Sequence, residues 1–154
     1  MSRRRKWFFI VLAALVSMAL AGAYLLSRNT ACDAPRVTSA SSSSMLAVVQ
    51  RCYGPPETLR LEQVAKPALE DDRVLIKVAA AGVNPLDWHY MRGEPYIMRM
   101  ESGVGKPTDS RFGVDFAGTI EAVGSKVTMF KPGDKVFGSA AGAFAEYVTV
   151  RASR

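Results

Sequence analysis

The sequence predicts an α+β domain that is mainly β-structure, a small barrel or sandwich, carried behind one apolar N-terminal helix. From residue 45 onward, short stretches of strand-forming residues alternate with turns that contain glycine and proline. One segment of that region, beginning at Asn84, has clear helix-start signals. Ahead of it, Trp7–Leu26 is a run of twenty residues without a charge. These three observations define the fold class.

The first 26 residues form a targeting or anchoring segment. Basic residues at positions 3–6 precede an apolar run as long as a membrane-spanning helix requires. Two interpretations stay open: an uncleaved signal-anchor, or a signal peptide cleaved near the small residues at 19–23. The basic flank predicts a cytoplasmic N-terminus, which places the domain outside the cytoplasm. The domain is then a single-pass membrane protein in the first case and secreted or periplasmic in the second.

The formal net charge of +6 is concentrated in this leader. The first 36 residues hold six of the 20 basic residues and one of the 14 acidic ones. The remainder is close to neutral, so the high isoelectric point gives no support for a nucleic-acid partner. The basic residues favour the membrane surface as the partner of the leader.

Residues 27–44 are polar and end in a run of serines, which predicts a flexible tether. The chain has two cysteines, Cys32 and Cys52, and no C-x-x-C motif. This count excludes a self-contained cysteine-rich zinc site. One disulfide is arithmetically possible in an oxidising compartment, but with Cys32 in the tether we expect two unrelated thiols.

The folded part, 45–154, divides into strands and turns. Residues 59–64 alternate apolar with polar, as a half-buried strand does, and 74–81 form a continuous apolar run that predicts a buried strand. Residues 94–111 have mixed polarity and are expected to form a long irregular loop. The further predicted strands are 45–50, 113–124, 136–137 and 144–150.

The stretch 79–93 connects a strand to a helix. Asn84 is a favoured N-cap, the proline that follows it is favoured at the first helical position, and Asp87 in the first turn suits the positive end of the helix dipole. Gly93 is placed to end the helix. His89, the only histidine in the chain, lies within this segment. Polar groups gathered where a strand passes into a helix are typical of a ligand-facing edge.

Three segments together carry a resemblance to a known family. They are VLIKVAAAGVNPLDWHYMRG (74–93), GVDFAGTIEAVGSKVTMFKPGDKVFG (113–138) and GAFAEYVTV (142–150). In this order and spacing they resemble the N-terminal, GroES-like catalytic domain of medium-chain dehydrogenases/reductases, over roughly residues 45–151. The resemblance implies a GroES-like, partly open β-barrel.

The resemblance also indicates a subfamily. Zinc-dependent members carry a cysteine ligand at the position of Asn84 and a His-Glu pair at the positions of Val114 and Asp115. An amide and an alkyl group cannot replace thiolate and imidazole as zinc ligands. The chain therefore resembles the zinc-free, quinone-oxidoreductase-like branch, which reduces quinones, enones or activated carbonyls with NADPH or NADH, and no metal is expected.

What the resemblance implies for the site is specific. Asn84 lies beside the nicotinamide and Asp87 is the second cofactor-binding candidate, while His89 and Tyr90 are candidates for orienting the substrate or supplying a proton. The alternatives are structural. Asp87 would only order the first helical turn, and His89 would only pack against Trp88.

A nicotinamide enzyme also needs a dinucleotide-binding domain. No G-x-G-x-x-G motif follows a strand in these 154 residues. The family places that domain further along the chain, so we expect an N-terminal portion of the enzyme, with the Rossmann portion encoded downstream or supplied in trans. We expect residues 45–154 alone not to bind NADPH, which calorimetry can check. The alternative function is a non-enzymatic GroES-like interaction module.

Overall fold

The computed structural model describes residues 2–34 and 43–152. In chain order its elements are α1 (Arg3–Ser27), β1 (Ser44–Gln50), η1 (Pro56–Thr58), β2 (Leu59–Ala65), β3 (Arg73–Gly82), α2 (Pro85–Arg92), η2 (Tyr96–Met98), α3 (Arg99–Ser102), β4 (Asp115–Val123), β5 (Lys135–Ser139) and β6 (Tyr147–Arg151). The strands predicted from the sequence are all present. Their bounds differ by a few residues, as pattern-based boundaries usually do.

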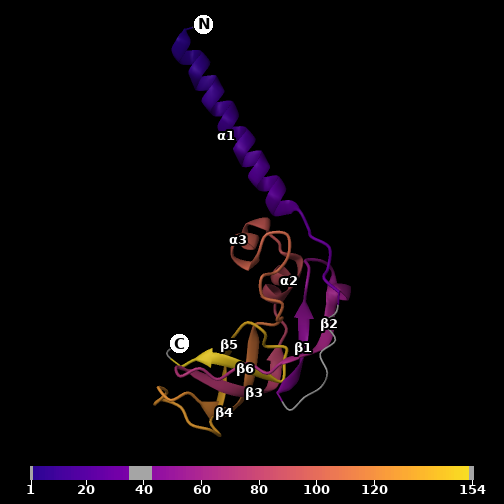
Figure 1. The fold of residues 1–154 in the computed structure, drawn as a ribbon, viewed down its shortest axis with the longest axis vertical. Helices are drawn as coiled ribbons and strands as arrows, with labels where there is room; N and C mark the ends of the chain where they lie inside the picture. The colour runs from indigo at the N-terminus through magenta and orange to yellow at the C-terminus, as the bar shows by residue number, and fades with distance from the viewer. Residues whose placement is uncertain (1, 35–42, 153–154) are drawn as a thin grey trace.

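The strands form two sheets beneath a long projecting helix (Figure 1). β1 and β2 make an antiparallel pair, and the other four strands form an antiparallel sheet in the order β5-β4-β3-β6. The α+β GroES-like fold is thus as expected, but the two sheets do not close into a barrel. Helices α2 and α3 lie between the sheets and the end of α1 (Figure 1).

The hydrophobic core lies on the four-stranded sheet. Its buried members come from β3, β4 and β6 and the turn before β6: Val74, Ile76, Phe116, Ile120, Ala143 and Val148. The rings of Phe112 and Phe144 meet edge to face at 5.4 Å beside this core. Phe116 therefore belongs to the core, and the half-buried Phe144 packs against it together with the buried Phe112.

In the centre of β2, the burial of the side chains differs from what the alternating sequence pattern predicts. Leu61 is 68% exposed, whereas Glu62 is 8% exposed and forms an ion pair with Arg51. A carboxylate can be buried when it is paired and hydrogen-bonded in this way. Leu61 therefore lies on the exposed face of β2, opposite to the face of Glu62.

The apolar run of β3 is buried only in its first half. Val74, Leu75 and Ile76 are buried, but residues 79–82 are exposed, and Val83 after them is 83% exposed. The prediction of a fully buried strand is wrong for this second half. The strand continues past its own core, which leaves apolar surface uncovered at the edge where α2 begins.

The cysteine prediction is wrong. Cys32 and Cys52 form a disulfide, with their Cα atoms 4.8 Å apart. The segment 28–34 is also held on the domain, because the Thr30 N–H donates to the Gly105 carbonyl and Lys106 pairs with Asp33. For residues 28–34, the prediction of a flexible tether is therefore corrected. Residues 35–42 of the tether lie outside the described residues.

The expected irregular loop, 94–111, contains ordered turns of helix. η2 and α3 follow one another without a break, and Arg99 between them is 1% exposed. An arginine so deeply buried requires several acceptors, and its side chain donates to four backbone carbonyls. Polar composition alone does not distinguish such a segment from a loop.

Within the described residues, α1 is the one helix long and apolar enough to cross a membrane by length and composition. None of its residues is buried against the rest of the protein. A signal sequence near the N-terminus meets the same criteria. The membrane anchor and the extracytoplasmic location therefore stay predictions.

Candidate active site

The candidate site lies at one edge of the four-stranded sheet, where three elements meet. Gly82 at the end of β3 pairs with Asp115 at the start of β4, and Asp115 pairs with Ser139 at the end of β5. The chain leaves β3 at this edge and enters α2 through Asn84. Register therefore brings together residues that are up to 57 positions apart in the sequence.

A chain of hydrogen bonds joins these residues. The Asn84 Nδ2 donates to the Asp115 Oδ2 at 2.6 Å, and the Ser139 Oγ donates to the Asp115 Oδ1 at 2.7 Å. Both carboxylate oxygens of Asp115 thus have a partner. The Asn84 amide and the Asp115 carboxylate are therefore in direct contact.

The start of α2 fixes the plane of the Asn84 amide. Its Oδ1 accepts from the Leu86 N–H at 2.8 Å, and the Asn84 N–H donates to the Asp87 Oδ2 at 2.9 Å, which completes a capping box. With Oδ1 held by the helix and one Nδ2 hydrogen held by Asp115, the second amide hydrogen of Asn84 has no partner among the residues that the structure describes.

Asp87 is 2% exposed, much less than a helix-capping carboxylate on a surface would be. Its second carboxylate oxygen, Oδ1, is buried and has no hydrogen-bond partner among the described residues. The capping role inferred from the sequence is present. The cofactor-binding role of Asp87 stays a prediction.

His89 has its contacts at the opposite end of α2. Its Nδ1 lies 2.6 Å from the Glu94 carbonyl oxygen, and its ring meets the Trp88 ring edge to face with centroids 5.0 Å apart. A carbonyl oxygen only accepts, so Nδ1 carries the proton and Nε2 is the acceptor of the neutral ring. The hydrogen bond and the ring contact of His89 are thus made to Glu94 and Trp88, not to the Asn84 amide.

Tyr90 lies beside His89 with a half-buried side chain. Its backbone carbonyl accepts a hydrogen bond from Gln50 Nε2 at 3.2 Å, and the same nitrogen donates to the Met91 carbonyl at 2.7 Å. Gln50 is 3% exposed at the end of β1 and thereby holds the C-terminal end of α2. The sequence analysis did not identify Gln50, because an isolated glutamine gives no motif.

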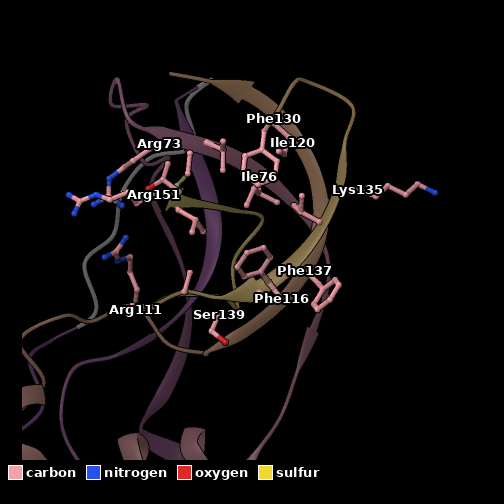
Figure 2. A pocket seen from close by; sticks show the side chains of 18 residues that line it. Arg73, Ile76, Arg111, Phe116, Ile120, Phe130, Lys135, Phe137, Ser139 and Arg151 are labelled. Atoms are coloured by element: carbon pink, nitrogen blue, oxygen red, sulfur yellow. The ribbon is translucent and has the colours of Figure 1, made fainter. Parts of the chain in front are cut away.

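A cavity of about 640 Å³ opens on the concave face of the four-stranded sheet, next to this edge. Figure 2 shows Ile76, Phe116, Ile120 and Phe130 around its interior and Ser139 at one end. Its volume is within the range of small-molecule sites. Ser139 is thus shared by the cavity and by the Asp115 hydrogen bonds.

Arginines line one side of the cavity: Arg73, Arg111 and Arg151 (Figure 2). Each is paired with a carboxylate, and the best-defined pair joins Arg111 to Asp109. Burial acts to raise the pKa of Asp109, but hydrogen bonds from the side chain and backbone of Arg111 hold that pKa below its usual value. This side of the cavity is therefore close to charge-neutral.

Among the described residues, no three His, Cys, Asp or Glu side chains gather in a way that would hold a metal ion. Independence from zinc nevertheless stays a prediction. In the sequence, Asp115 is marked only by the resemblance, at one position of the His-Glu pair of zinc-dependent members, and Ser139 belongs to no motif. Strand register brings the two together, and no local motif signals it.

Comparison with known proteins identifies the domain. The alcohol dehydrogenase GroES-like domain matches residues 70–154, more than half of the chain. Quinone oxidoreductase of Lama guanicoe is 44% identical over 98 residues, which cover 62% of this chain and 28% of that protein. The chloroplastic NADPH-dependent alkenal/one oxidoreductase of Arabidopsis thaliana is 34% identical over 141 residues, 80% of this chain and 34% of that protein.

The solved structures give the same result. The quinone oxidoreductase from Coxiella burnetii superposes with a TM-score of 0.60 and 31% identity, over 70% of this chain and 35% of that one. The 154 residues thus span about a quarter to a third of the length of these relatives. The chain belongs to the alcohol dehydrogenase GroES-like domain family, in the quinone-oxidoreductase-like part of the medium-chain dehydrogenases/reductases.

Proposed function

We propose that this chain forms the substrate-side domain of a zinc-independent, NAD(P)H-dependent oxidoreductase that is tethered to a membrane by α1. Its substrates are quinones, enones or related activated carbonyls. The relatives named for quinone and alkenal/one reduction support the substrate class. The observation that carries the proposal is the hydrogen-bonded chain of Asn84, Asp115 and Ser139.

The hydrogen-bonded group of Asn84, Asp115 and Ser139 is better suited to binding a carbonyl than to binding a metal ion. Asp115 accepts from both neighbours, so its role is to orient the Asn84 amide. The remaining amide hydrogen of Asn84 is a fixed donor for a carbonyl oxygen. A donor held in place before the reaction stabilises negative charge that develops on that oxygen without a further cost of reorganisation.

Hydride addition leaves an enolate or quinol anion, which then needs a proton. His89 is suited to this task because the Glu94 carbonyl keeps its Nδ1 hydrogen in both protonation states. In the imidazolium form, Nε2 is then the nitrogen that releases a proton. Tyr90 is the second proton-donor candidate, since a phenol also both donates and accepts.

The nicotinamide cofactor supplies the hydride when it is bound. Asn84 and Asp87 are the residues proposed to lie at the cofactor, Asn84 through its amide and the buried Asp87 through its hold on the Asn84 N–H. The capping box also locks the backbone of these two residues together. Asp87 therefore positions Asn84 in addition to any contact of its own.

The test measures NADPH oxidation with a soluble quinone and with an alkenal as acceptors. The protein is tagged at its native locus and extracted in mild detergent, so that every segment or partner accompanying residues 1–154 is retained. Asn84→Ser keeps a capping oxygen but removes the amide hydrogens. We expect kcat/KM to fall roughly 100-fold, as for loss of one preorganised donor.

Asn29→Ser is the matched control, because Asn29 is the other asparagine of the chain and lies in the exposed linker segment. We expect wild-type kinetics from it, and no effect of a zinc chelator on the wild-type enzyme. His89→Gln should lower kcat, because it removes the proposed proton donor. Equal activity of the two asparagine variants would overturn the assignment of the site.

A further inference from the structure

A group of exposed apolar side chains lies on η2, α3 and the residue pair that follows. It consists of Tyr96, Ile97, Met100 and Val104, which we call the η2–α3 face. Ile97 is 64% exposed and Met100 is 71% exposed. These two residues are three positions apart on continuous helical turns, so they share one side. A patch of this kind on a small domain indicates an interaction surface.

The position of this face relative to α1 indicates its partner. Trp7–Leu26 contains twenty residues, and a helix of that length covers about 30 Å, the thickness of a bilayer hydrocarbon core. Leu26 therefore comes at the boundary of the hydrocarbon. Tyr24 and Arg28, whose guanidinium lies 5.7 Å from the Tyr24 ring, are residue types that favour this interface.

Arg99 holds α3 against that boundary. Its Nη1 donates to the carbonyls of Leu26 at 2.9 Å and Arg28 at 3.0 Å. Its Nε and Nη2 donate to the carbonyls of Gly93 and Arg92 at 2.7 and 3.2 Å. The cation thus joins the C-terminal ends of α1 and α2, where the helix dipoles are negative.

The Tyr53 and Tyr96 rings complete the environment of Arg99, with centroids 4.4 and 4.7 Å from its guanidinium carbon. The contact between α1 and the domain is consequently built from a buried side chain and backbone atoms. Figure 1 shows α3 as the part of the domain next to the end of α1, with both sheets further away. The η2–α3 face therefore lies at the depth of the lipid headgroups when α1 spans the bilayer.

We propose that the η2–α3 face docks into the headgroup boundary of the same bilayer that α1 crosses. The partner is a lipid surface, because the face adjoins the end of the spanning segment and carries aliphatic and tyrosine side chains suited to that layer. Arg99 then transmits the position of α1 to α2, so that the domain has one orientation on the membrane. The inference concerns lipid contact and does not depend on reductase activity.

The test places a fluorophore on the face of the full chain in pure lipid vesicles. Met100→Cys is labelled with an environment-sensitive dye under non-reducing conditions, in which Cys32 and Cys52 stay paired. Met129→Cys is the matched control, a methionine that is 77% exposed in the β4–β5 connection. Leu15→Cys, in the middle of α1, reports the bilayer interior. The vesicles contain phosphatidylcholine, phosphatidylglycerol and nitroxide-labelled lipids.

The dye at position 100 is expected to shift to the blue and to be quenched at least twofold more by shallow nitroxides than the dye at position 129. The dye at position 15 is expected to respond most to deep nitroxides. Equal quenching at positions 100 and 129 would overturn the proposal. Absence of deep quenching at position 15 would overturn it as well, since α1 would then not cross the bilayer. Ile97→Cys repeats the measurement at a second exposed site.

Discussion

Removing the Cys32–Cys52 disulfide is the perturbation whose effect the structure defines best. The crosslink joins residues 20 positions apart, and Cys32 is exposed whereas Cys52 is 2% exposed. Cys32→Ser therefore removes the bond and leaves the buried partner in place. The polar contacts of the linker, from Thr30 to Gly105 among others, stay possible in the variant.

The expected magnitude follows from the entropy of the unfolded chain. Closing a loop of about 20 residues lowers that entropy enough to stabilise the folded state by about 3 kcal/mol. For a domain of this size, such a loss corresponds to a fall in Tm of roughly 10–20 °C. The assay is urea unfolding of the full chain in mild detergent, followed by tryptophan fluorescence, with and without a reductant.

Three samples make the comparison decisive. Oxidised wild type is expected to be about 3 kcal/mol more stable than both Cys32→Ser and reduced wild type. Reductant should leave Cys32→Ser unchanged. If oxidised and reduced wild type unfold within 1 kcal/mol of each other, the disulfide does not constrain the unfolded chain and the reasoning is wrong.

Two further predictions concern Gly93 and the Asp109–Arg111 pair. Gly93→Ala should lower the free energy of unfolding by about 2–4 kcal/mol, because φ is +62° and a Cβ would come within 2.6–2.7 Å of Tyr53 and Arg99 atoms; a loss no larger than 1 kcal/mol in urea unfolding would refute the crowding. For Asp109, an NMR titration should give a pKa below 3.8, and Arg111→Gln should raise it. The Asp109–Arg111 pair stabilises the folded protein at pH values above the pKa that Asp109 has in the unfolded chain. This stabilisation is lost as the pH falls through the pKa that Asp109 has in the folded protein. A pKa of Asp109 at or above 3.8 in the folded wild type would contradict this.

The sequence was sufficient to predict the elements that are stabilised by interactions between residues close together in the chain. The start of α2 follows from Asn84 and Asp87, since a cap and a first-turn carboxylate act within one turn of helix. The left-handed end at Gly93 follows in the same way. Most strands also follow from short patterns, and three segments in register were enough to indicate the family.

Tertiary structure decided the features that depend on contacts between distant residues. Glu62 is buried and Leu61 is exposed because Arg51 supplies a charge partner, which outweighs the alternating pattern of β2. Asp115 and Ser139 meet Asn84 only through strand register. A residue type does not encode which acceptor or donor another strand will bring to it.

The same reasoning explains the linker and the segment after α2. Composition marked 27–44 as a tether and 94–111 as a loop, because polar residues without periodicity give no local signal of packing. Arg99 binds carbonyls from two helices, and Cys32 reaches Cys52 across 20 residues, so both segments are ordered by partners far away in the sequence. Sequence alone therefore determined the family and the capped helix. The fold decided how the leader, α2 and the site edge are connected. Those connections depend on hydrogen bonds to backbone carbonyls and on strand register, which no local pattern encodes.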